Sequence, residues 1–349
     1  ALIWTLRGAI GELAAAMAAL LTALSPAFVY YNRYFIQESL LVFFMVAALS
    51  AGLRYATRPG YAPALAFGVA LGLAHATKET AALVIMCGVV AGCIVWFLGR
   101  GGRRGRLPHI TTPRNHALAA VLAAACCSML LYSSFFTNPR GIIDSVATYA
   151  NYFQRADGAG LHDKPWYYYL SLLAYVHRSP GPWWSEGLVL VLAAVGGVVA
   201  WWNGVKQARF IAVAAAITFA AFSAIAYKTP WNVLSPYQLI VIVAGVGAAA
   251  LIASLRGNLA RTIAALALAI GTAHLGVQAW RASFELPADP RTPYVYAHTS
   301  SAFMRFAERA EGLAAVHPEG YAMRIDVIQP DGDYWPIPWY LRRFSRVGY

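Results

Sequence analysis

The stretch TAALVIMCGVVAGCIVWFL, residues 80–98, contains no charged side chain. An apolar run of about 18 residues or more is long enough to cross the hydrocarbon core of a bilayer as a helix. The next stretch, GRGGRRGRLPHITTPRN (residues 99–115), contains five arginines and no acid. Because cytoplasmic loops are enriched in Lys and Arg, the two stretches together predict a transmembrane helix that ends in the cytoplasm.

Similar apolar runs recur along the chain of 349 residues, of which 59% are hydrophobic and 12% are charged. A soluble domain has a charged fraction of about 25%. We therefore predict an all-α polytopic membrane protein with about nine spans, of which the third is short and the sixth is marginal. The spans are residues 10–29, 36–53, 61–77, 80–98, 116–135, 187–202, 210–227, 234–255 and 260–280.

The charges of the connecting loops orient these spans. If residues 99–115 are cytoplasmic, the alternate loops also carry Lys or Arg and contain no Asp or Glu. The basic residues of those loops are Arg7, Arg54, Arg58, Lys206, Arg209, Arg256 and Arg261. Membrane topology thus explains the formal net charge of +12, and we expect a lipid bilayer and no nucleic acid as a partner.

The opposite, extracytoplasmic face receives every acid of the chain except Glu12. We assign residues 1–280 to a transmembrane domain, with residues 137–186 as a long outer loop. Residues 281–349 are expected to form a small extracytoplasmic α/β domain, with strands at 294–298 and 321–328 around a helix near 300–316. We expect the chain to be a fragment that lacks its N-terminus and whose C-terminal domain is truncated.

Three short outer segments carry candidate site residues. SPAFVYYNRYFIQESLLVFF, residues 25–44, holds Arg33 and Glu38, and Arg33 does not serve as a positive-inside anchor on this face. Lys78 in HATKET either snorkels to the interface or binds a lipid phosphate. The same two interpretations apply to Lys228 in YKTPWN, where Trp231 suits the interface belt and Asn232 closes the turn.

The long outer loop has a pattern of its own. Residues 141–153 place apolar side chains on one helical face, which predicts a helix lying on the membrane or packed on the outer ends of the spans. The run PWYYYLSLLAYV (residues 165–176) is too short to span and is expected to be interfacial or re-entrant. His162 and Asp163 just before it are candidate metal ligands, although an ordinary loop role fits two adjacent residues better.

Together these segments resemble the dolichyl-phosphate-mannose–protein mannosyltransferase-like enzymes, which are glycosyltransferase family 39-like proteins with the multi-span GT-C fold. In residues 25–44 a Ser-Pro, a Tyr pair, an Arg and a Glu follow in the family's order. GLAHATKET and HDKPWYYYL resemble two further family segments. YKTPWN and DYWPIPWYLRRF are similar to a less characterised prokaryotic subfamily linked to surface-protein glycosylation.

The resemblance implies an inverting hexosyltransferase of the prokaryotic cell membrane. Such an enzyme takes a sugar from a polyprenyl-phosphate-linked donor on the outer face and passes it to a protein, lipid or glycan acceptor. The base, typically an Asp in the first outer loop, is expected upstream of residue 1, so the catalytic base stays unassigned. The need for a divalent metal ion stays open, with Glu38, His162 and Asp163 as candidates.

Our site hypothesis assigns the carrier phosphate to Arg33 and Lys228, while the snorkelling interpretation is favoured for Lys78 taken alone. Trp166 and Tyr167–Tyr169 are expected to shape the lipid or sugar pocket by stacking. Glu38 is a supporting group that orients Arg33 or contacts the sugar or a metal. The substrate-binding candidates are Arg33, Lys78, Lys228, Trp166, Tyr167, Tyr168, Tyr169, Trp231 and Asn232. Two other functions stay open: a transporter or lipid-carrier flippase, for which broken helices with polar groups at mid-membrane would be expected, and a non-catalytic accessory protein of surface glycosylation.

Overall fold

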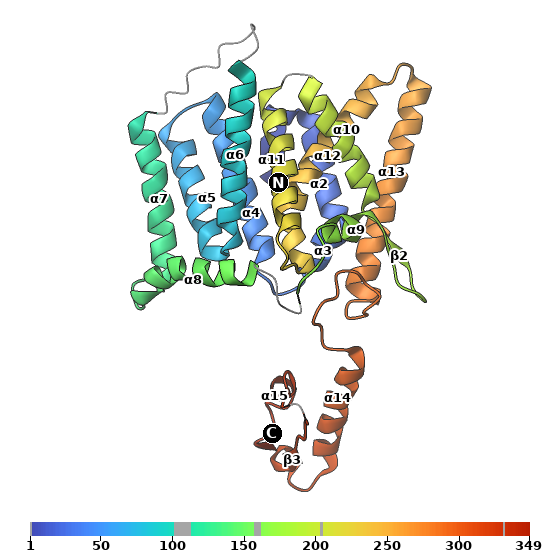
Figure 1. Cartoon of the computed structure of the whole chain (residues 1–349). Coiled ribbons are helices and arrows are strands. Elements are labelled where there is room, and N and C mark those ends of the chain that lie inside the picture. Colours follow the sequence, from blue (N-terminus) through green and yellow to red (C-terminus); the bar gives the residue numbers. More distant parts are fainter. Residues whose placement is uncertain (1, 101–112, 157–161, 203–204, 331) are drawn as a thin grey trace.

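The structure, a computed structural model, describes residues 2–100, 113–156, 162–202, 205–330 and 332–349. Its main body is a bundle of long helices that run roughly side by side (Figure 1). The chain starts with η1 (Leu2–Leu6) and α1 (Arg7–Ile10). The bundle helices are α2 (Glu12–Leu24), α4 (Glu38–Thr57), α5 (Tyr61–Thr77), α6 (Thr80–Arg100), α7 (Arg114–Tyr132), α10 (Gly187–Trp202), α11 (Lys206–Ala224), α12 (Leu234–Ser254) and α13 (Asn258–Trp280), and the short α3 (Pro26–Asn32) follows α2.

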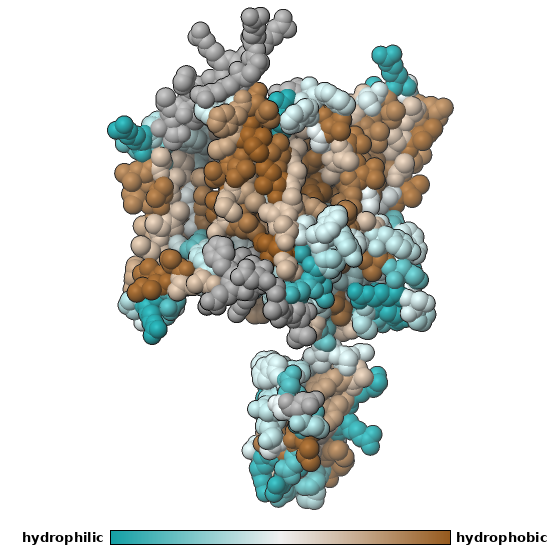
Figure 2. Space-filling view, in the orientation of Figure 1, coloured by the Kyte–Doolittle hydropathy of each residue, from teal (hydrophilic) through white to brown (hydrophobic). Residues whose placement is uncertain are grey.

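Each of the nine predicted spans coincides with helix in the structure. Within the described residues, six helices are long and apolar enough to cross a membrane, and the bent pair α2–α3 adds a seventh. The remaining two, α5 and α10, are apolar but only 17 and 16 residues long. Figure 2 shows an apolar band over the body of the bundle, as expected for a protein that faces lipid. The chain is thus a polytopic helical membrane protein.

The first predicted span, residues 10–29, is broken into two helices. Ser25 caps α3, since its side chain accepts a hydrogen bond from the Phe28 backbone N–H at 3.4 Å, and Pro26 occupies the first turn. Both residues favour a helix start at this point. As a result α3 is bent by 59° relative to α2, so it turns across the end of the bundle instead of continuing through it.

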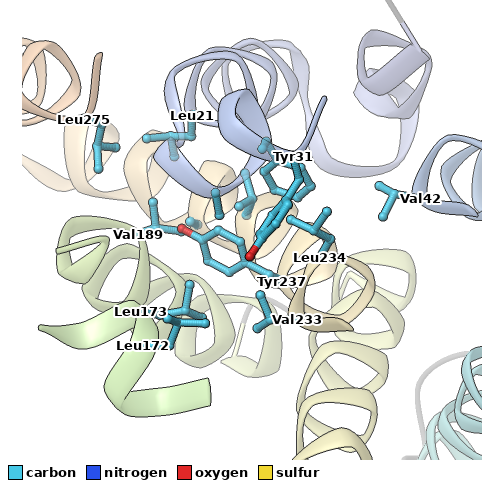
Figure 3. Packing of buried hydrophobic residues seen from close by; sticks show 14 of the residues in the cluster. Leu21, Tyr31, Val42, Leu172, Leu173, Val189, Val233, Leu234, Tyr237 and Leu275 are labelled. Atoms are coloured by element: carbon cyan, nitrogen blue, oxygen red, sulfur yellow. The ribbon is translucent and has the colours of Figure 1, made fainter. Parts of the chain in front are cut away.

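Helix α12 forms the centre of the bundle, and small residues let its neighbours approach closely. A Cβ atom added at Gly247 would lie 1.9 Å from the Leu192 carbonyl oxygen of α10, and one at Gly245 would lie 2.3 Å from the Ala14 carbonyl oxygen of α2. Such contacts are typical of packing between membrane helices. Figure 3 shows Tyr31 of α3 and Tyr237 of α12 within the largest buried cluster, at the end where α3 crosses.

The two ends of the bundle differ in structure. One end carries α8 (Arg140–Ala156), α9 (Tyr168–Ala174), the two-stranded ribbon of β1 (Val176–His177) and β2 (Trp183–Trp184), and the C-terminal segment (Figure 1). The end of α10, the start of α11 and the connection from α12 to α13 lie at the other end. Residues 101–112, which hold three arginines of the predicted cytoplasmic loop, lie outside the described residues.

Helix α8 forms where the sequence predicts an amphipathic helix, at residues 141–153. It runs across the direction of the bundle helices (Figure 1). Its Ile143 and Val146 side chains are each 70% exposed, which suits an apolar face turned toward the membrane interface. A Cβ atom at Gly141 would lie 1.9 Å from the Tyr132 carbonyl oxygen, so the absence of a side chain lets α8 start tightly against the end of α7.

The C-terminal segment has a small core of its own, formed by Ala310, Ala314, Met323, Leu341 and Phe344. It contains the π-helical turn η3 (Arg281–Glu285), α14 (Ser301–Val316), η4 (Gly320–Ala322), β3 (Arg324–Asp326), α15 (Ile337–Tyr340) and β4 (Arg346–Gly348). Strands β3 and β4 pair in parallel. The predicted strand at 294–298 is wrong, because these residues bind the bundle through side-chain contacts such as the 2.8 Å bond from the Tyr31 hydroxyl to the Tyr294 carbonyl.

Candidate active site

Three residues that are far apart in the sequence meet at the end of the bundle where α3 crosses. Glu38 is the first residue of α4, Lys78 precedes α6, and Asn232 lies in the 3-10 turn η2 (Pro230–Val233) that leads into α12. The Lys78 ammonium forms an ion pair with Glu38 Oε1 and donates a hydrogen bond to Asn232 Oδ1 at 2.8 Å. We call Glu38, Lys78 and Asn232 the Lys78 cluster.

The Lys78 cluster has unused hydrogen-bonding capacity. A lysine ammonium has three N–H donors, and two of those of Lys78 are engaged. Glu38 Oε2 is buried and has no hydrogen-bond partner among the described residues. The cluster therefore offers one charged donor and one carboxylate acceptor, which is the complement of a phosphate oxygen next to a hydroxyl group.

An apolar cavity of about 240 Å³ lies directly inside the bundle from the Lys78 cluster. Val42, Val84 and Ser235 line it, and they follow Glu38, Lys78 and Asn232 along the chain by four, six and three residues. Val89 also lines the cavity and is 61% exposed, so the cavity opens on the lipid-facing side of α6. The full lining is Val42, Met45, Val46, Ala48, Leu49, Phe67, Leu71, Val84, Ile85, Gly88, Val89, Phe210, Ala214, Thr218, Ser235, Gln238 and Leu239.

An aromatic wall borders the Lys78 cluster on one side. Trp231, the neighbour of Asn232, lies with its ring 6.3 Å from that of Tyr31, 6.4 Å from that of Tyr34 and 5.5 Å from that of Tyr296. We call Tyr31, Tyr34, Trp231 and Tyr296 the aromatic wall. Burial raises the pKa of Tyr296, whose hydroxyl is hydrogen-bonded to His162 Nδ1. The wall thus joins α3, η2 and the segment after α13 through neutral side chains.

Lys228 has a different environment from Lys78. Only 1% of it is exposed, and its ammonium donates hydrogen bonds to the backbone carbonyls of Lys164, at 3.0 Å, and Ile225. Burial lowers the pKa of Lys228, and the nearby charge of Asp163 opposes that shift. The Lys228 backbone N–H also donates to the His162 carbonyl at 3.0 Å. Lys228 therefore fastens residues 162–164 to the turn before α12, and its role toward phosphate stays a prediction.

Arg33 lies apart from Glu38, although the two are close in the sequence. Its Nη1 donates a hydrogen bond to the Ser283 carbonyl, and its guanidinium stacks over the Phe284 ring at 3.9 Å. The expectation that Glu38 orients Arg33 is wrong, because α3 ends at Asn32 and α4 begins at Glu38, so the two side chains meet different neighbours. Arg33 instead lines a separate pocket, the Arg33 pocket, formed by Tyr30, Arg33, Tyr34, Ser283, Pro287, Ala288 and His298.

The aromatic run at the start of α9 divides into an outer and an inner part. Trp166 and Tyr167 are 69% and 50% exposed. Burial raises the pKa of Tyr168 to about 12. Tyr169 is buried, and its hydroxyl donates to the Thr229 carbonyl at 3.2 Å. Tyr169 therefore supports the turn before α12, whereas Trp166 and Tyr167 are exposed.

The metal candidates do not come together. Glu38 is paired with Lys78, and His162 is bonded to Tyr296. Asp163 forms a backbone bridge with Tyr227. Among the described residues, no three His, Cys, Asp or Glu side chains form a group that could hold a metal ion.

Sequence reasoning missed Glu186, which is fully buried at the start of α10. Its Oε1 accepts hydrogen bonds from the Ala27 backbone N–H and the Tyr294 hydroxyl, both at 3.0 Å, and its Oε2 accepts one from the Tyr237 hydroxyl at 2.5 Å. Burial raises the pKa of Glu186. This carboxyl group holds the first turn of α3 against α12. The one feature of the sequence that points to Glu186 is its position directly before the apolar run of α10.

Comparisons with known proteins agree with this architecture. Residues 2–140 match the family model described as dolichyl-phosphate-mannose-protein mannosyltransferase. The fold is similar to that of ArnT from Cupriavidus metallidurans, solved bound to undecaprenyl phosphate, with a TM-score of 0.55 and 17% sequence identity over 99% of this chain and 68% of that chain. No curated protein matches. The chain therefore has the mannosyltransferase-like GT-C fold, and the fold prediction is confirmed.

Proposed function

We propose that this protein is a membrane glycosyltransferase that uses a polyprenyl-phosphate-linked sugar as its donor. The observation that carries the proposal is that the polar Lys78 cluster lies next to the apolar cavity. A polyprenyl phosphate has the same division, with an anionic head and a long apolar tail. The match of residues 2–140 and the fold shared with a protein solved with undecaprenyl phosphate support this choice.

The contacts of the Lys78 cluster suggest how the donor lies. The free N–H of Lys78 donates to a phosphate oxygen, and Glu38 Oε2 accepts a hydrogen bond from a sugar hydroxyl. The prenyl tail enters the cavity between α4 and α6, past Val42 and Val84. Trp231 and Tyr34, which are partly exposed, offer aromatic faces on which a sugar ring stacks, and the buried Tyr31 supports Trp231 edge-on.

The proposed reaction is a single displacement at the sugar carbon that bears the phosphate. The acceptor hydroxyl oxygen forms a bond to this carbon while the carbon–oxygen bond to the phosphate breaks. The phosphate leaves with the bonding electron pair, and the acceptor proton passes to a general base. Lys78 stabilises the charge that develops on the leaving phosphate, which is the role of a preorganised cation in such a transfer. The identity of the base is not part of the proposal.

We place the reaction on the extracytoplasmic face, at the end of the bundle that carries the C-terminal segment. The argument is the distribution of loop charge, because Arg54 and Arg58 lie at the other end of α4, away from Glu38. The polar cluster at one end of the helices also favours a transferase over a transporter, in which polar groups are expected near the middle of the membrane. The acceptor is a protein, lipid or glycan.

A turnover assay tests the proposed function. Membranes that contain the full-length protein are supplied with radiolabelled undecaprenyl-phosphate-linked sugars, and transfer of label to the acceptor fraction is followed. We expect transfer with the wild-type protein and loss of transfer with Lys78→Gln, which keeps the side chain polar but removes its charge. Arg58→Gln, at the opposite end of α4, is the matched control. Equal transfer with Lys78→Gln and wild type would contradict the proposed site.

A further inference from the structure

The Arg33 pocket contains a cation that no acid of the described chain neutralises. The two acids closest in sequence to the pocket residues have other partners: Glu285 lies 3.8 Å from Arg281, and Asp289 lies 2.6 Å from Arg291. Of the five N–H donors of Arg33, one is engaged, at the Ser283 carbonyl. The pocket has a volume of about 250 Å³, which leaves room for a ligand beside the guanidinium.

A second group in the Arg33 pocket also lacks a partner. The Ser283 hydroxyl is buried, and no described residue forms a hydrogen bond with it; the residue as a whole is 6% exposed. A buried polar atom without a partner is destabilising. A ligand with a hydrogen-bonding group at this position would remove that destabilisation. The buried Ser283 hydroxyl is therefore the indication of a ligand, and the exposed Arg33 beside it supplies the positive charge.

The remaining polar groups of the Arg33 pocket are neutral. The Tyr30 hydroxyl donates to the Pro287 carbonyl at 2.7 Å, so the contact of 2.8 Å between Tyr30 and His298 requires His298 Nε2 to be the donor. Burial lowers the pKa of His298, which favours this neutral form. The charge of the pocket is thus the single positive charge of Arg33.

The Arg33 pocket and the Lys78 cluster are neighbours on opposite sides of the aromatic wall. The Tyr34 ring stacks on the His298 ring of the pocket at 4.6 Å, and it also lies 6.4 Å from the ring of Trp231, next to Asn232 of the cluster. The structure therefore has two cationic sites on one face, separated by side chains that suit sugar stacking. A transferase needs two adjacent binding sites of this kind.

We propose that the Arg33 pocket is the acceptor subsite and that it binds an acidic, hydroxyl-bearing head group. The inference rests on the proposed transferase function, which assigns the donor to the Lys78 cluster. The acidic group is a phosphate or a carboxylate, because the planar guanidinium of Arg33 pairs with both in a two-point contact. The Ser283 hydroxyl then bonds a ligand oxygen, and Tyr34 holds the ring of the head group near the donor.

Binding of small acidic sugars tests this proposal. The full-length protein is placed in phosphatidylcholine nanodiscs, and the affinities of glucose 6-phosphate, glucuronate and glucose are measured by saturation-transfer NMR. We expect both acidic sugars to bind at least about 10-fold more tightly than glucose, since the charge-assisted contact to Arg33 is absent for glucose. Equal affinity of glucose and glucose 6-phosphate would overturn the proposal.

Variants assign the binding to the Arg33 pocket. Arg33→Gln is expected to weaken glucose 6-phosphate binding about 10-fold or more, and Ser283→Ala about 3-fold. Arg281→Gln is the matched control, because Arg281 lies on the same π-helical turn but outside the pocket, and its binding should equal that of wild type. Wild-type affinity in Arg33→Gln would overturn the proposal.

Two further measurements separate this proposal from its alternatives. Arg33→Gln should keep wild-type affinity for undecaprenyl phosphate, and this binding also shows that the variant is folded. Loss of that affinity would place Arg33 in the donor site. The acceptor subsite would then be wrong, while the proposed transferase function would stand. Glucose 6-phosphate affinity should not change when phosphatidylglycerol is added to the nanodiscs. Competition by phosphatidylglycerol would mean that the pocket takes bilayer head groups, and would overturn the acceptor assignment.

Discussion

The Lys78 cluster and the turn around Lys228 lie at the same end of the bundle, and each surrounds a lysine ammonium with oxygen atoms. The oxygens around Lys78 belong to the side chains of Glu38 and Asn232. Those around Lys228 are backbone carbonyls of Lys164 and Ile225. The side chain of Lys78 is 16% exposed above a cavity, whereas Lys228 is 1% exposed. One lysine is open to a ligand, and the other joins two segments of the chain.

The comparison shows why a lysine at this end of the bundle is not by itself a phosphate site. Burial of an ammonium is costly unless oxygen atoms replace its water, and both lysines meet this requirement. Lys228 also has two of its three N–H donors engaged, but at 1% exposure it is closed to a ligand. Lys78 keeps an unused donor beside an unpaired carboxylate oxygen of Glu38, so its environment is completed only by a ligand.

The largest expected effect separates the two lysines by turnover. Lys78→Gln should lower kcat/KM for an undecaprenyl-phosphate-linked sugar by about 100-fold or more, because the leaving phosphate loses its cation. Lys228→Met should lower kcat/KM by less than about 10-fold, because it only displaces the loop that carries Lys164. Removing a group that does not contact the reacting atoms costs less transition-state stabilisation. Steady-state kinetics in detergent or nanodiscs measure both values. Similar losses in the two variants would remove the distinction between the sites.

The apolar cavity provides a second test, on the tail of the donor. A Cβ atom added at Gly88, which lines the cavity, meets nothing within 4 Å, so Gly88→Leu fills cavity space without a backbone clash. We expect it to raise KM for an undecaprenyl donor about 10-fold, which corresponds to about 1.4 kcal/mol of lost tail binding. A donor with a two-isoprene tail should be much less affected.

Gly197→Leu is the matched control for the cavity variant. A Cβ atom at Gly197 of α10 also meets nothing within 4 Å, but this glycine does not line the cavity. Its KM for both donors should equal that of wild type. If Gly88→Leu and Gly197→Leu behave alike with the long-chain donor, the tail lies elsewhere.

A third test concerns stability and applies to the Lys228 turn. Lys228→Met leaves the carbonyls of Lys164 and Ile225 without their donor. The free energy of unfolding should fall by about 1–3 kcal/mol, the usual cost of unpaired buried polar groups. Thermal unfolding in detergent measures the change, and Lys206→Met, at the start of α11 on the other end of the bundle, is the control. Unchanged stability would show that the turn does not depend on Lys228.

The smallest expected effect is the pH dependence of the same turn. Burial lowers the pKa of Lys228 below its usual value of 10.5, so the folded protein binds fewer protons than the unfolded chain between the lowered pKa and 10.5. Stability conferred at this site therefore rises with pH across that window. The difference in unfolding free energy between wild type and Lys228→Met should increase as pH rises toward 10.5, and a constant difference would contradict this account.

The helices were predictable from the sequence because membrane spans depend on local composition. The predicted spans at 61–77 and 187–202 have the bounds of α5 and α10. The break of the first span at Ser25 was not predicted, although a Ser-Pro pair is a helix-start signal. The strand at 294–298 failed for a different reason: alternation favours a strand only where a partner strand is available.

The residues of the candidate site were predictable from the sequence, but which of them contact one another was not. Lys78, Asn232 and Glu38 were all candidates, and the structure brings them together. Proximity in the sequence favoured Glu38 with Arg33, whereas the end of α3 and the start of α4 send the two side chains to different neighbours. Glu186 escaped notice because its three partners come from segments that only the folded bundle brings together.

The central claim is that the Lys78 cluster and the cavity inside it hold the polyprenyl phosphate. The most direct measurement is the Kd of undecaprenyl phosphate for the full-length protein in phosphatidylcholine nanodiscs, compared between wild type, Lys78→Gln, Lys228→Met and Arg33→Gln. We predict an increase in Kd of about 10-fold or more for Lys78→Gln, the value of one charge-assisted contact, and changes within about 2-fold for the other two variants. An unchanged Kd for Lys78→Gln would contradict the claim.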